Sequence, residues 1–207
     1  RAPSTCASPS TLRRTCMLGG ALAGAERSVT LVRPGDDFSR NENGFRVRPG
    51  SIEDILELFV RLKQQGGTPD RVVHLWTLGE ASARDTVELG LNTLIAIARA
   101  AREVGFGTWA LDVVTAGTLQ VGDDDPIVPA RATVHGPCTI LPVEDPGGSI
   151  RLVDLVHGRP APVEHVVREL LTAPANQVLA LRGGRRWMPD FEILELADEP
   201  DPQAVPL

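Results

Sequence analysis

Residues 71–114, RVVHLWTLGEASARDTVELGLNTLIAIARAAREVGFGTWALDVV, contain two apolar runs separated by a long amphipathic segment. The runs RVVHLW (71–76) and TWALDVV (108–114) are short and rich in β-branched residues, which is typical of buried strands. Between them, residues 83–103 follow a helical period, with Leu89, Leu94, Ile97 and Ala101 on the inward face. A strand, a helix and a second strand in this order predict a parallel strand pair with a crossover helix.

The segment before this unit adds two strands and one helix. Residues 28–33 (SVTLVR) predict a strand that stops at Pro34-Gly35, and residues 44–48 predict a short second strand. Ser51 is the expected N-cap of a helix whose apolar face carries Ile52, Ile55, Leu56, Phe59 and Leu62. This helix is expected to end at Gly66-Gly67.

The segment after it repeats the alternation. Residues 130–141 predict a helix interrupted at Gly136-Pro137, because proline inside a helix removes a hydrogen bond. A strand at 149–156, a helix at 162–171, and two strands at 177–182 and 186–196 follow, the last two joined across Gly183-Gly184. The whole pattern predicts an α/β fold: a three-layer, Rossmann-like, truncated parallel sheet with helices on both faces and a C-terminal strand pair.

Composition excludes several kinds of partner and chemistry. The net charge of −6 disfavours nucleic acid as a partner, since phosphate binding needs a basic surface. The most apolar stretch, residues 89–98, is too short to span a bilayer, so we expect no membrane partner and a cytoplasmic location. Tyrosine is absent from the chain and Lys63 is its single lysine. A phenolic proton donor is therefore excluded.

The two ends differ in composition from the body. Residues 1–18 are rich in Ser, Thr, Pro and Arg and are interpreted as a linker or disordered lead-in. Residues 197–207 (ADEPDPQAVPL) are interpreted as a proline-rich linker. A globular body at 19–196 between two linkers is the pattern of a module inside a multidomain chain. Cys6, Cys16 and Cys138 are widely spaced, and we interpret them as reduced thiols with no metal or redox role.

No motif for binding a nucleotide or for nucleophilic catalysis is present. A dinucleotide-binding turn needs G-x-G-x-x-G after a first strand, and Gly19, Gly20 and Gly24 do not have that spacing. Lys63 has no glycine loop before it, which excludes a P-loop, and no G-x-S-x-G elbow occurs. We expect the small residues at 19–24 to pack a helix closely against a sheet.

The titratable residues are scattered rather than clustered. His74 falls inside a buried strand, where a hydrogen-bonded core histidine is the expected role. His135, His157 and His165 have no spacing that suits a metal. Asp123-Asp124-Asp125 could hold a divalent cation, but such sites use alternating ligands, so a solvated loop is the favoured interpretation. Arg185-Arg186-Trp187 could bind an anion, but a strand with solvated arginines is favoured.

Three stretches, taken together, resemble the ketoreductase region of modular type I polyketide synthases. They are GGTPDRVVHLWTLGE (66–80), VVTAGTLQVGDDDPIVPARATVHGPCTILPVEDPGGSIRLVDL (113–155) and NQVLALRGGRRWMPDFEIL (176–194), and SVTLVRPGDDF (28–38) fits the same region. The resemblance covers residues 28–196, and its order and spacing are similar to the family's N-terminal structural subdomain, which is short-chain-dehydrogenase-like.

The resemblance implies a segment without catalytic residues. In this family a catalytic subdomain follows the structural one, binds NADPH through a glycine-rich turn, and carries Ser, Tyr, Lys and Asn. Where an active copy has its serine, VVTAGTL offers Thr115 and Thr118, and where tyrosine and lysine would follow, the sequence is PARATVHGPC. We therefore expect no catalytic, cofactor-binding or metal-binding residue here, and NADPH in the partner subdomain only.

The same resemblance implies the partners. The expected role is to brace and position a catalytic subdomain that reduces β-ketoacyl thioesters on an acyl carrier protein, next to other synthase domains. Residues 1–27 depart from the family pattern, since RTCMLG is a weak version of the expected first strand. Two alternatives stay open: a degenerate pseudo-ketoreductase that serves only as an interaction module, and a free-standing enzyme using Asp or His chemistry at the carboxyl edge of the sheet.

Overall fold

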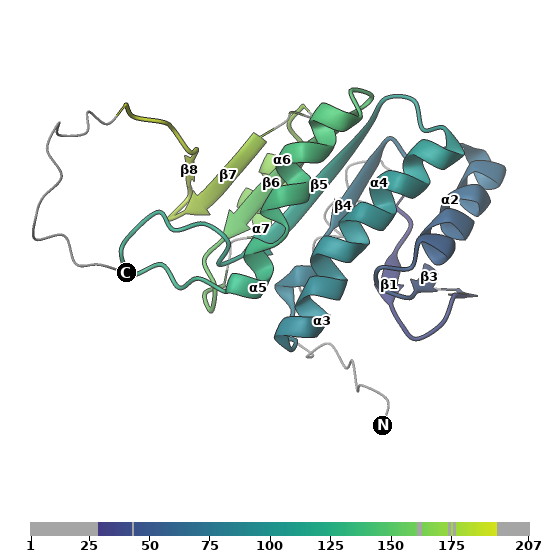
Figure 1. Cartoon of the computed structure of the whole chain (residues 1–207), viewed down its shortest axis with the longest axis horizontal. Coiled ribbons are helices and arrows are strands. Elements are labelled where there is room, and N and C mark those ends of the chain that lie inside the picture. Colours follow the sequence, from purple (N-terminus) through teal and green to yellow (C-terminus); the bar gives the residue numbers. More distant parts are fainter. Residues whose placement is uncertain (1–28, 43, 161–162, 174, 176, 194–207) are drawn as a thin grey trace, which may run out of the picture.

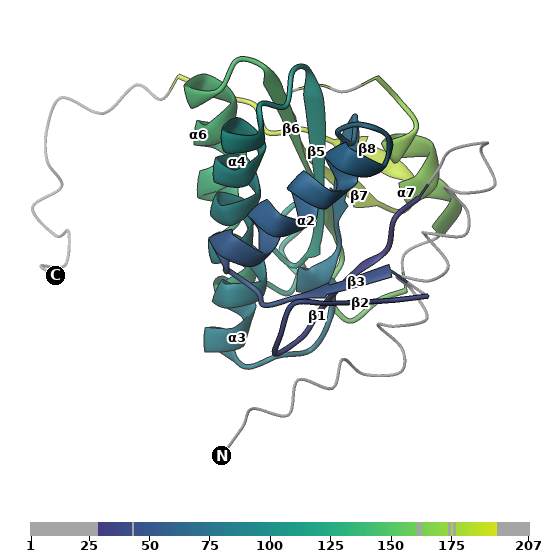
Figure 2. The same ribbon diagram turned by 90° about the vertical axis from the view of Figure 1, so that its right-hand side faces the viewer.

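The computed structural model describes residues 29–42, 44–160, 163–173, 175 and 177–193. The expected linkers at 1–18 and 197–207, the glycines at 19–24, Cys6 and Cys16 lie outside these residues. The elements appear in Figure 1 and Figure 2. The described strands are β1 (Val32–Pro34), β2 (Ser39–Asn41), β3 (Gly44–Val47), β4 (Arg71–His74), β5 (Trp109–Ala116), β6 (Gly148–Leu155), β7 (Gln177–Arg182) and β8 (Arg185–Trp187).

The helices alternate with the strands of the larger sheet. They are α2 (Ile52–Gly66), α3 (Ala83–Val87), α4 (Thr93–Val104), α5 (Pro129–Ala132), α6 (His135–Glu144) and α7 (Val163–Leu170). A 3₁₀ turn covers Trp76–Leu78, and a π-helical turn at Glu88–Asn92 joins α3 to α4. The predicted helix at 83–103 is thus one continuous helical segment with a π-turn inside it.

A five-stranded sheet with the order β4-β5-β6-β7-β8 forms the centre of the molecule. Strands β4 to β7 are parallel, and β8 is antiparallel to β7. The turn between β7 and β8 is Gly183-Gly184, and both glycines have positive φ, as a tight hairpin of this kind requires. A small sheet with the order β1-β3-β2 lies beside it.

Helices cover both faces of the large sheet, which gives three layers. On one face, α2, α4 and α6 pack on a core that includes Leu94, Ile97, Leu111 and Leu152. On the other face, α7 packs on Val114, Val153 and Leu179 through Val166 and Leu170. Figure 2 shows α4 and α6 on one side of the sheet and α7 on the other. The predicted α/β three-layer architecture is confirmed.

The connection over α7 has the opposite hand to the other crossovers. Strands β4, β5, β6 and β7 follow one another across the sheet in the same direction, yet α4 and α6 cover one face and α7 the other. Right-handed connections are the rule for parallel strands, so one of the two kinds of crossover departs from it. Because the order never reverses, the described sheet has no switch point of the kind at which open α/β sheets bind ligands.

A cluster of buried charges links the sheet to α7 near the amino ends of the strands. Arg151 is fully buried; its Nε donates to Asp112 Oδ1 at 2.7 Å and its Nη1 to Glu169 Oε1 at 3.2 Å. Arg186 on β8 pairs with the other oxygen of Glu169 at 2.9 Å, and Arg71 on β4 lies 3.5 Å from Asp112 Oδ2. Five elements are thus joined by one set of ion pairs, called here the Arg151 cluster.

Three boundaries differ from the sequence predictions. The helix at 130–141 breaks at Thr133-Val134 rather than at Gly136-Pro137, because Pro137 occupies the first turn of α6, where its missing N–H costs no hydrogen bond. The final strand ends at Trp187, so the prediction of strand over 188–193 was wrong, and 194–196 lie outside the described residues. The first strand begins at Val32 rather than near Ser28.

Candidate functional site at the carboxyl edge of the sheet

The carboxyl ends of β5 and β6 meet beneath a loop formed by residues 117–128. Gly117 leaves β5 with φ +78°, and a Cβ there would approach Pro126 O to 2.8 Å and His157 Cβ to 2.9 Å. The loop is fixed at both ends, since Gly117 N donates to Leu155 O and Val128 N donates to Gly117 O. The backbone therefore lies directly on the edge where open α/β sheets bind ligands.

Thr115 and Thr118 are buried at this edge and bonded to each other. Thr118 Oγ1 donates to Thr115 Oγ1 at 3.1 Å, and Thr118 N donates to Asp154 Oδ1 at 2.8 Å. Both hydroxyls are enclosed by the loop, and neither has a base beside it of the kind that activates a nucleophilic hydroxyl. Their arrangement is that of a polar core.

Asp154 and Arg182 form the centre of the edge. Asp154 is fully buried on β6, and its Oδ2 accepts from Arg182 Nη2 at 2.7 Å. Arg182 also donates from Nε to Asp125 Oδ2 at 2.7 Å and from Nη2 to Leu119 O at 2.8 Å. Burial opposes the charge on Arg182, but the bonds to both carboxylates outweigh it and raise its pKa. The same arginine holds the pKa of Asp125 below its usual range.

Arg131 fills the neighbouring space between β4 and β5. Its buried guanidinium donates to Gly79 O at 2.7 Å and to Ala116 O at 3.0 Å, and its Nη1 lies 2.9 Å from His157 Nδ1. Burial lowers the pKa of Arg131, with Glu80 and Asp154 acting in the opposite direction. Since the guanidinium cannot accept a hydrogen bond, His157 Nδ1 is the acceptor and is occupied.

The remaining histidines confirm their expected structural roles. His74, at the end of β4, has its Nε2 2.9 Å from Leu89 O in the π-turn, and this carbonyl fixes the proton on Nε2. Burial lowers the pKa of His74 to about 4, against a smaller opposite effect of that hydrogen bond. His135 is exposed on α6, and His165 on α7 lies against Gly184. The described residues thus place the four histidines apart from one another.

Other residues considered from the sequence also have structural positions. Asp123 and Asp124 are exposed, as expected of a solvated loop, whereas Asp125 binds Arg182. Lys63 Nζ donates to Val104 O at 2.7 Å at the end of α2. The residues Arg185, Arg186 and Trp187 are exposed on β8.

Two absences hold for the described part of the chain. It contains no group of three or more His, Cys, Asp or Glu side chains placed to bind a metal ion. None of its helices has the length and apolar character that crossing a bilayer demands. Burial raises the pKa of the Cys138 thiol to about 12, which keeps it protonated.

Sequence reasoning missed the role of Arg131, although its position contained a signal. The arginine stands in PARAT (129–133), among small residues and directly after an apolar stretch, where a solvated cation is not expected. The pairing of Arg182 with Asp154 and Asp125 had no local signal, since the partners are far apart in the sequence.

Comparison with solved structures defines the class of fold. A gluconate 5-dehydrogenase from Burkholderia cenocepacia J2315, solved with NADP and tartrate, matches at TM-score 0.62 and 14% identity over 85% of this chain and 92% of its own. The first ketoreductase of the tylosin polyketide synthase matches at TM-score 0.64 and 20% identity over 90% of this chain and 36% of its own. The keto acid-selecting NRPS module structure with adenylation, ketoreductase and pseudo Asub domains matches at TM-score 0.73 and 20% identity, over 84% of this chain and 16% of its own. The fold is therefore that of the short-chain dehydrogenases and ketoreductases.

Sequence comparison then gives the protein group. A phenolphthiocerol/phthiocerol polyketide synthase of Mycobacterium tuberculosis (strain CDC 1551 / Oshkosh) is 31% identical over 156 residues, which are 69% of this chain and 8% of that synthase. Residues 18–97 match a family described as "Beta-ketoacyl synthase-like, N-terminal". By sequence the chain is a relative of polyketide synthases, and by fold it is ketoreductase-like, as the resemblance predicts. It spans less than a tenth of the length of that synthase.

Proposed function

We propose that this chain is the structural subdomain of a polyketide synthase ketoreductase, and that it performs no catalysis itself. In this proposal it braces and positions an NADPH-dependent catalytic subdomain of the same polypeptide. That subdomain reduces β-ketoacyl thioesters carried by an acyl carrier protein. A cytoplasmic location follows from the same assignment, as does proximity to the other domains of the synthase.

The observation that carries the proposal is the filled carboxyl edge. Carbonyl reduction needs a cofactor beside the substrate and a proton donor within hydrogen-bond reach of the carbonyl oxygen. At this edge Arg131 and Arg182 occupy the space above β5 and β6, and the loop at 117–128 is packed over them. The hydroxyls of Thr115 and Thr118 are bonded within the protein, and the chain has no tyrosine.

The test compares the chain alone with the chain plus its catalytic partner. Calorimetric titration of the purified chain with NADPH should show no binding at micromolar concentrations. Co-expression with the catalytic subdomain of the same synthase should increase the yield of soluble, active reductase over that subdomain expressed alone. Micromolar NADPH binding by the isolated chain would overturn the proposal.

The same experiment separates the alternative of a degenerate interaction module. If the following subdomain associates with the chain but binds no NADPH and reduces no β-ketoacyl thioester, the pair is a pseudo-ketoreductase. If it associates and reduces the thioester, this chain is the structural half of an active enzyme.

A further inference from the structure

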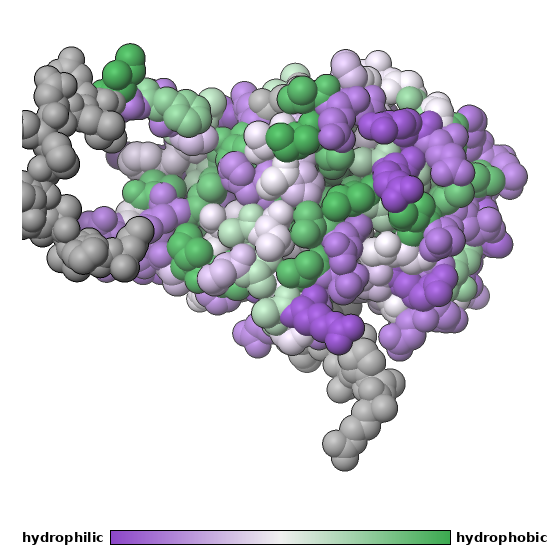
Figure 3. All heavy atoms as spheres, viewed as in Figure 1, coloured by the Kyte–Doolittle hydropathy of each residue, from purple (hydrophilic) through white to green (hydrophobic). Residues whose placement is uncertain are grey.

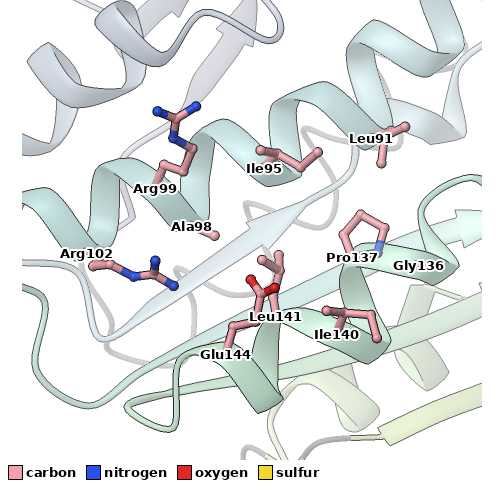
Figure 4. Close-up of a pocket in the computed structure, with 10 residues that line it drawn as sticks. All are labelled: Leu91, Ile95, Ala98, Arg99, Arg102, Gly136, Pro137, Ile140, Leu141 and Glu144. Atoms are coloured by element: carbon pink, nitrogen blue, oxygen red, sulfur yellow. The ribbon is translucent and has the colours of Figure 1, made fainter.

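A groove runs between α4 and α6 on the outer face of the molecule. Its volume is about 470 Å³, and its walls include Leu91, Ile95 and Ala98 from one side and Pro137, Ile140 and Leu141 from the other. Figure 4 shows the side chains of the two helices facing each other across it. Figure 3 shows apolar side chains on this face, bordered by hydrophilic ones. We call this feature the α4–α6 groove.

Helix α6 is apolar on its outer face as well as on its inner face. Pro137 and Cys138 are buried toward the sheet, while Ile140 and Val143 point outward with exposed fractions of 53% and 78%. Up to Glu144, the helix HGPCTILPVE carries no charged side chain apart from any charge on His135. A helix that is apolar all round is normally buried, so α6 has the composition of a helix covered by another protein surface.

The charges along the groove are placed at one end. Arg99 and Arg102 follow Ile95 along α4, whereas Leu91 and Pro137 line the opposite end. Within the described residues, neither guanidinium makes an ion pair with another part of the chain. Two cations beside an apolar groove are complementary to an apolar surface that carries an acidic residue toward one end.

This asymmetry disfavours a second copy as the occupant. A two-fold axis through the middle of the groove would place Arg99 and Arg102 of one copy over the apolar Leu91 end of the other. The two cations would then be desolvated against apolar side chains, which is costly without a paired anion. The charge pattern therefore favours a different surface over an identical one.

The related structures show that further protein accompanies this fold in a ketoreductase. The match fills 92% of the gluconate dehydrogenase chain, but it fills only 36% of the tylosin ketoreductase chain. One copy of the fold thus accounts for a whole dehydrogenase and for about a third of that ketoreductase. The remainder of such a chain is large enough to cover a groove of this size.

We propose that the α4–α6 groove is the docking surface for an apolar helix of the catalytic subdomain. That helix carries an acidic residue facing Arg99 and Arg102, and its apolar side chains cover Ile95, Ile140 and Val143. This inference rests on the proposed function and adds to it the surface through which the bracing contact is made. It makes the outer face of α6 part of the interior of the complete ketoreductase.

The test uses co-expression of the chain with the catalytic ketoreductase subdomain of the same synthase. Ile140→Glu should weaken their association about tenfold or more, because it places a carboxylate in the centre of a covered apolar surface. Leu171→Glu is the matched control: Leu171 is exposed to a similar degree but follows α7 on the opposite face of the sheet. Affinity is measured by calorimetry on the purified components, and circular dichroism verifies that each variant is folded.

Charge reversal tests the polar end separately. Arg102→Glu should weaken the association about tenfold, Arg102→Lys should retain most of it, and Arg84→Glu on α3 is the matched control for a lost exposed cation. Hydrogen exchange should also show α6 amides protected in the complex but not in the isolated chain. This readout supports the docking surface even if Ile140→Glu proves poorly folded.

The outcomes distinguish this inference from the function on which it rests. If wild-type chain and catalytic subdomain fail to associate, the proposed function fails. If they associate, and Ile140→Glu and Arg102→Glu bind as wild type does with α6 unprotected, the proposed function stands and the groove is not the docking surface. If the isolated chain dimerises and Ile140→Glu makes it monomeric without affecting the partner, the occupant is a second copy and the inference is overturned.

Discussion

The carboxyl edge of the sheet and the α4–α6 groove treat their side chains in opposite ways. At the edge, polar and charged groups are buried and satisfied: Arg182 pairs with Asp154 and Asp125, and Arg131 donates to two carbonyls. At the groove, apolar groups such as Ile140 and Val143 remain exposed. The position at which this fold class usually binds ligands is therefore closed, and a surface that a self-sufficient domain would make polar is open.

Breaking the closed edge should have the largest effect. Arg182→Ala removes the cation that pairs with the fully buried Asp154 and leaves an uncompensated carboxylate. We expect a loss of about 3 kcal/mol in the free energy of unfolding. Urea denaturation monitored by tryptophan fluorescence measures it, with the exposed Arg84→Ala as control. A loss no larger than that of the control would mean that the edge is not held by this pair.

Acid should weaken the folded state through His74. Burial depresses its pKa to about 4 in the folded chain, while the unfolded value is about 6.5, so the unfolded state binds the proton first. The resulting stability is fully present above pH 6.5 and is lost as pH falls toward 4, by up to about 1.4 kcal/mol per pH unit. His74→Gln keeps a donor for Leu89 O but does not titrate.

The measurement for His74 is the pH dependence of urea unfolding for wild type and His74→Gln. The difference between the two slopes between pH 6.5 and pH 4 isolates the histidine, because all other titrating groups are common to both proteins. Parallel slopes would contradict the depressed pKa.

A pair of glycine substitutions sharpens the comparison between the two regions. Gly117→Ala forces a Cβ to within 2.8 Å of Pro126 O at a positive φ, so we expect a loss of about 2 kcal/mol. Gly136→Ala lies in the first turn of α6 beside the groove, with no atom near the new Cβ, and should stabilise by about 0.5 kcal/mol. Opposite signs in thermal unfolding would confirm that the edge is tightly packed and the groove is open.

The smallest effect is expected for Ile140→Glu in the isolated chain. The side chain is more than half exposed, so its free energy of unfolding should change by no more than about 0.5 kcal/mol. Chemical denaturation of the chain alone provides the value. A loss of several kcal/mol would show that Ile140 belongs to the core of this chain.

The sequence was most informative where one element alone decides its own structure. The runs at Arg71–His74 and Trp109–Ala116 are apolar enough to identify buried parallel strands, and Ser51 identifies the start of α2 because its hydroxyl accepts from Asp54 N. Helical periodicity likewise located the segment that contains α4. The expectation of a Rossmann-like sheet followed from these local signals.

What sequence reasoning missed depends on contacts between distant residues or on exact position within a turn. Pro137 was taken as a helix break, but in the first turn of α6 its missing N–H has no partner to lose. The π-turn at Glu88–Asn92 has no local signature, and Gly90 within it fits closely between Thr77 and Val134, which belong to other elements. The domain limits at 18 and 197 stay predictions, since they lie outside the described residues.

The Arg151 cluster limits where this chain can be shortened. Arg151 on β6 is neutralised by Asp112 before it and by Glu169 after it, and Glu169 is held in turn by Arg186 on β8. A chain cut before α7 would keep the buried guanidinium but lose one of its two carboxylates, leaving excess positive charge within the sheet. A boundary chosen for expression or domain exchange therefore has to follow Trp187, so that the last strand and its arginine travel with the body.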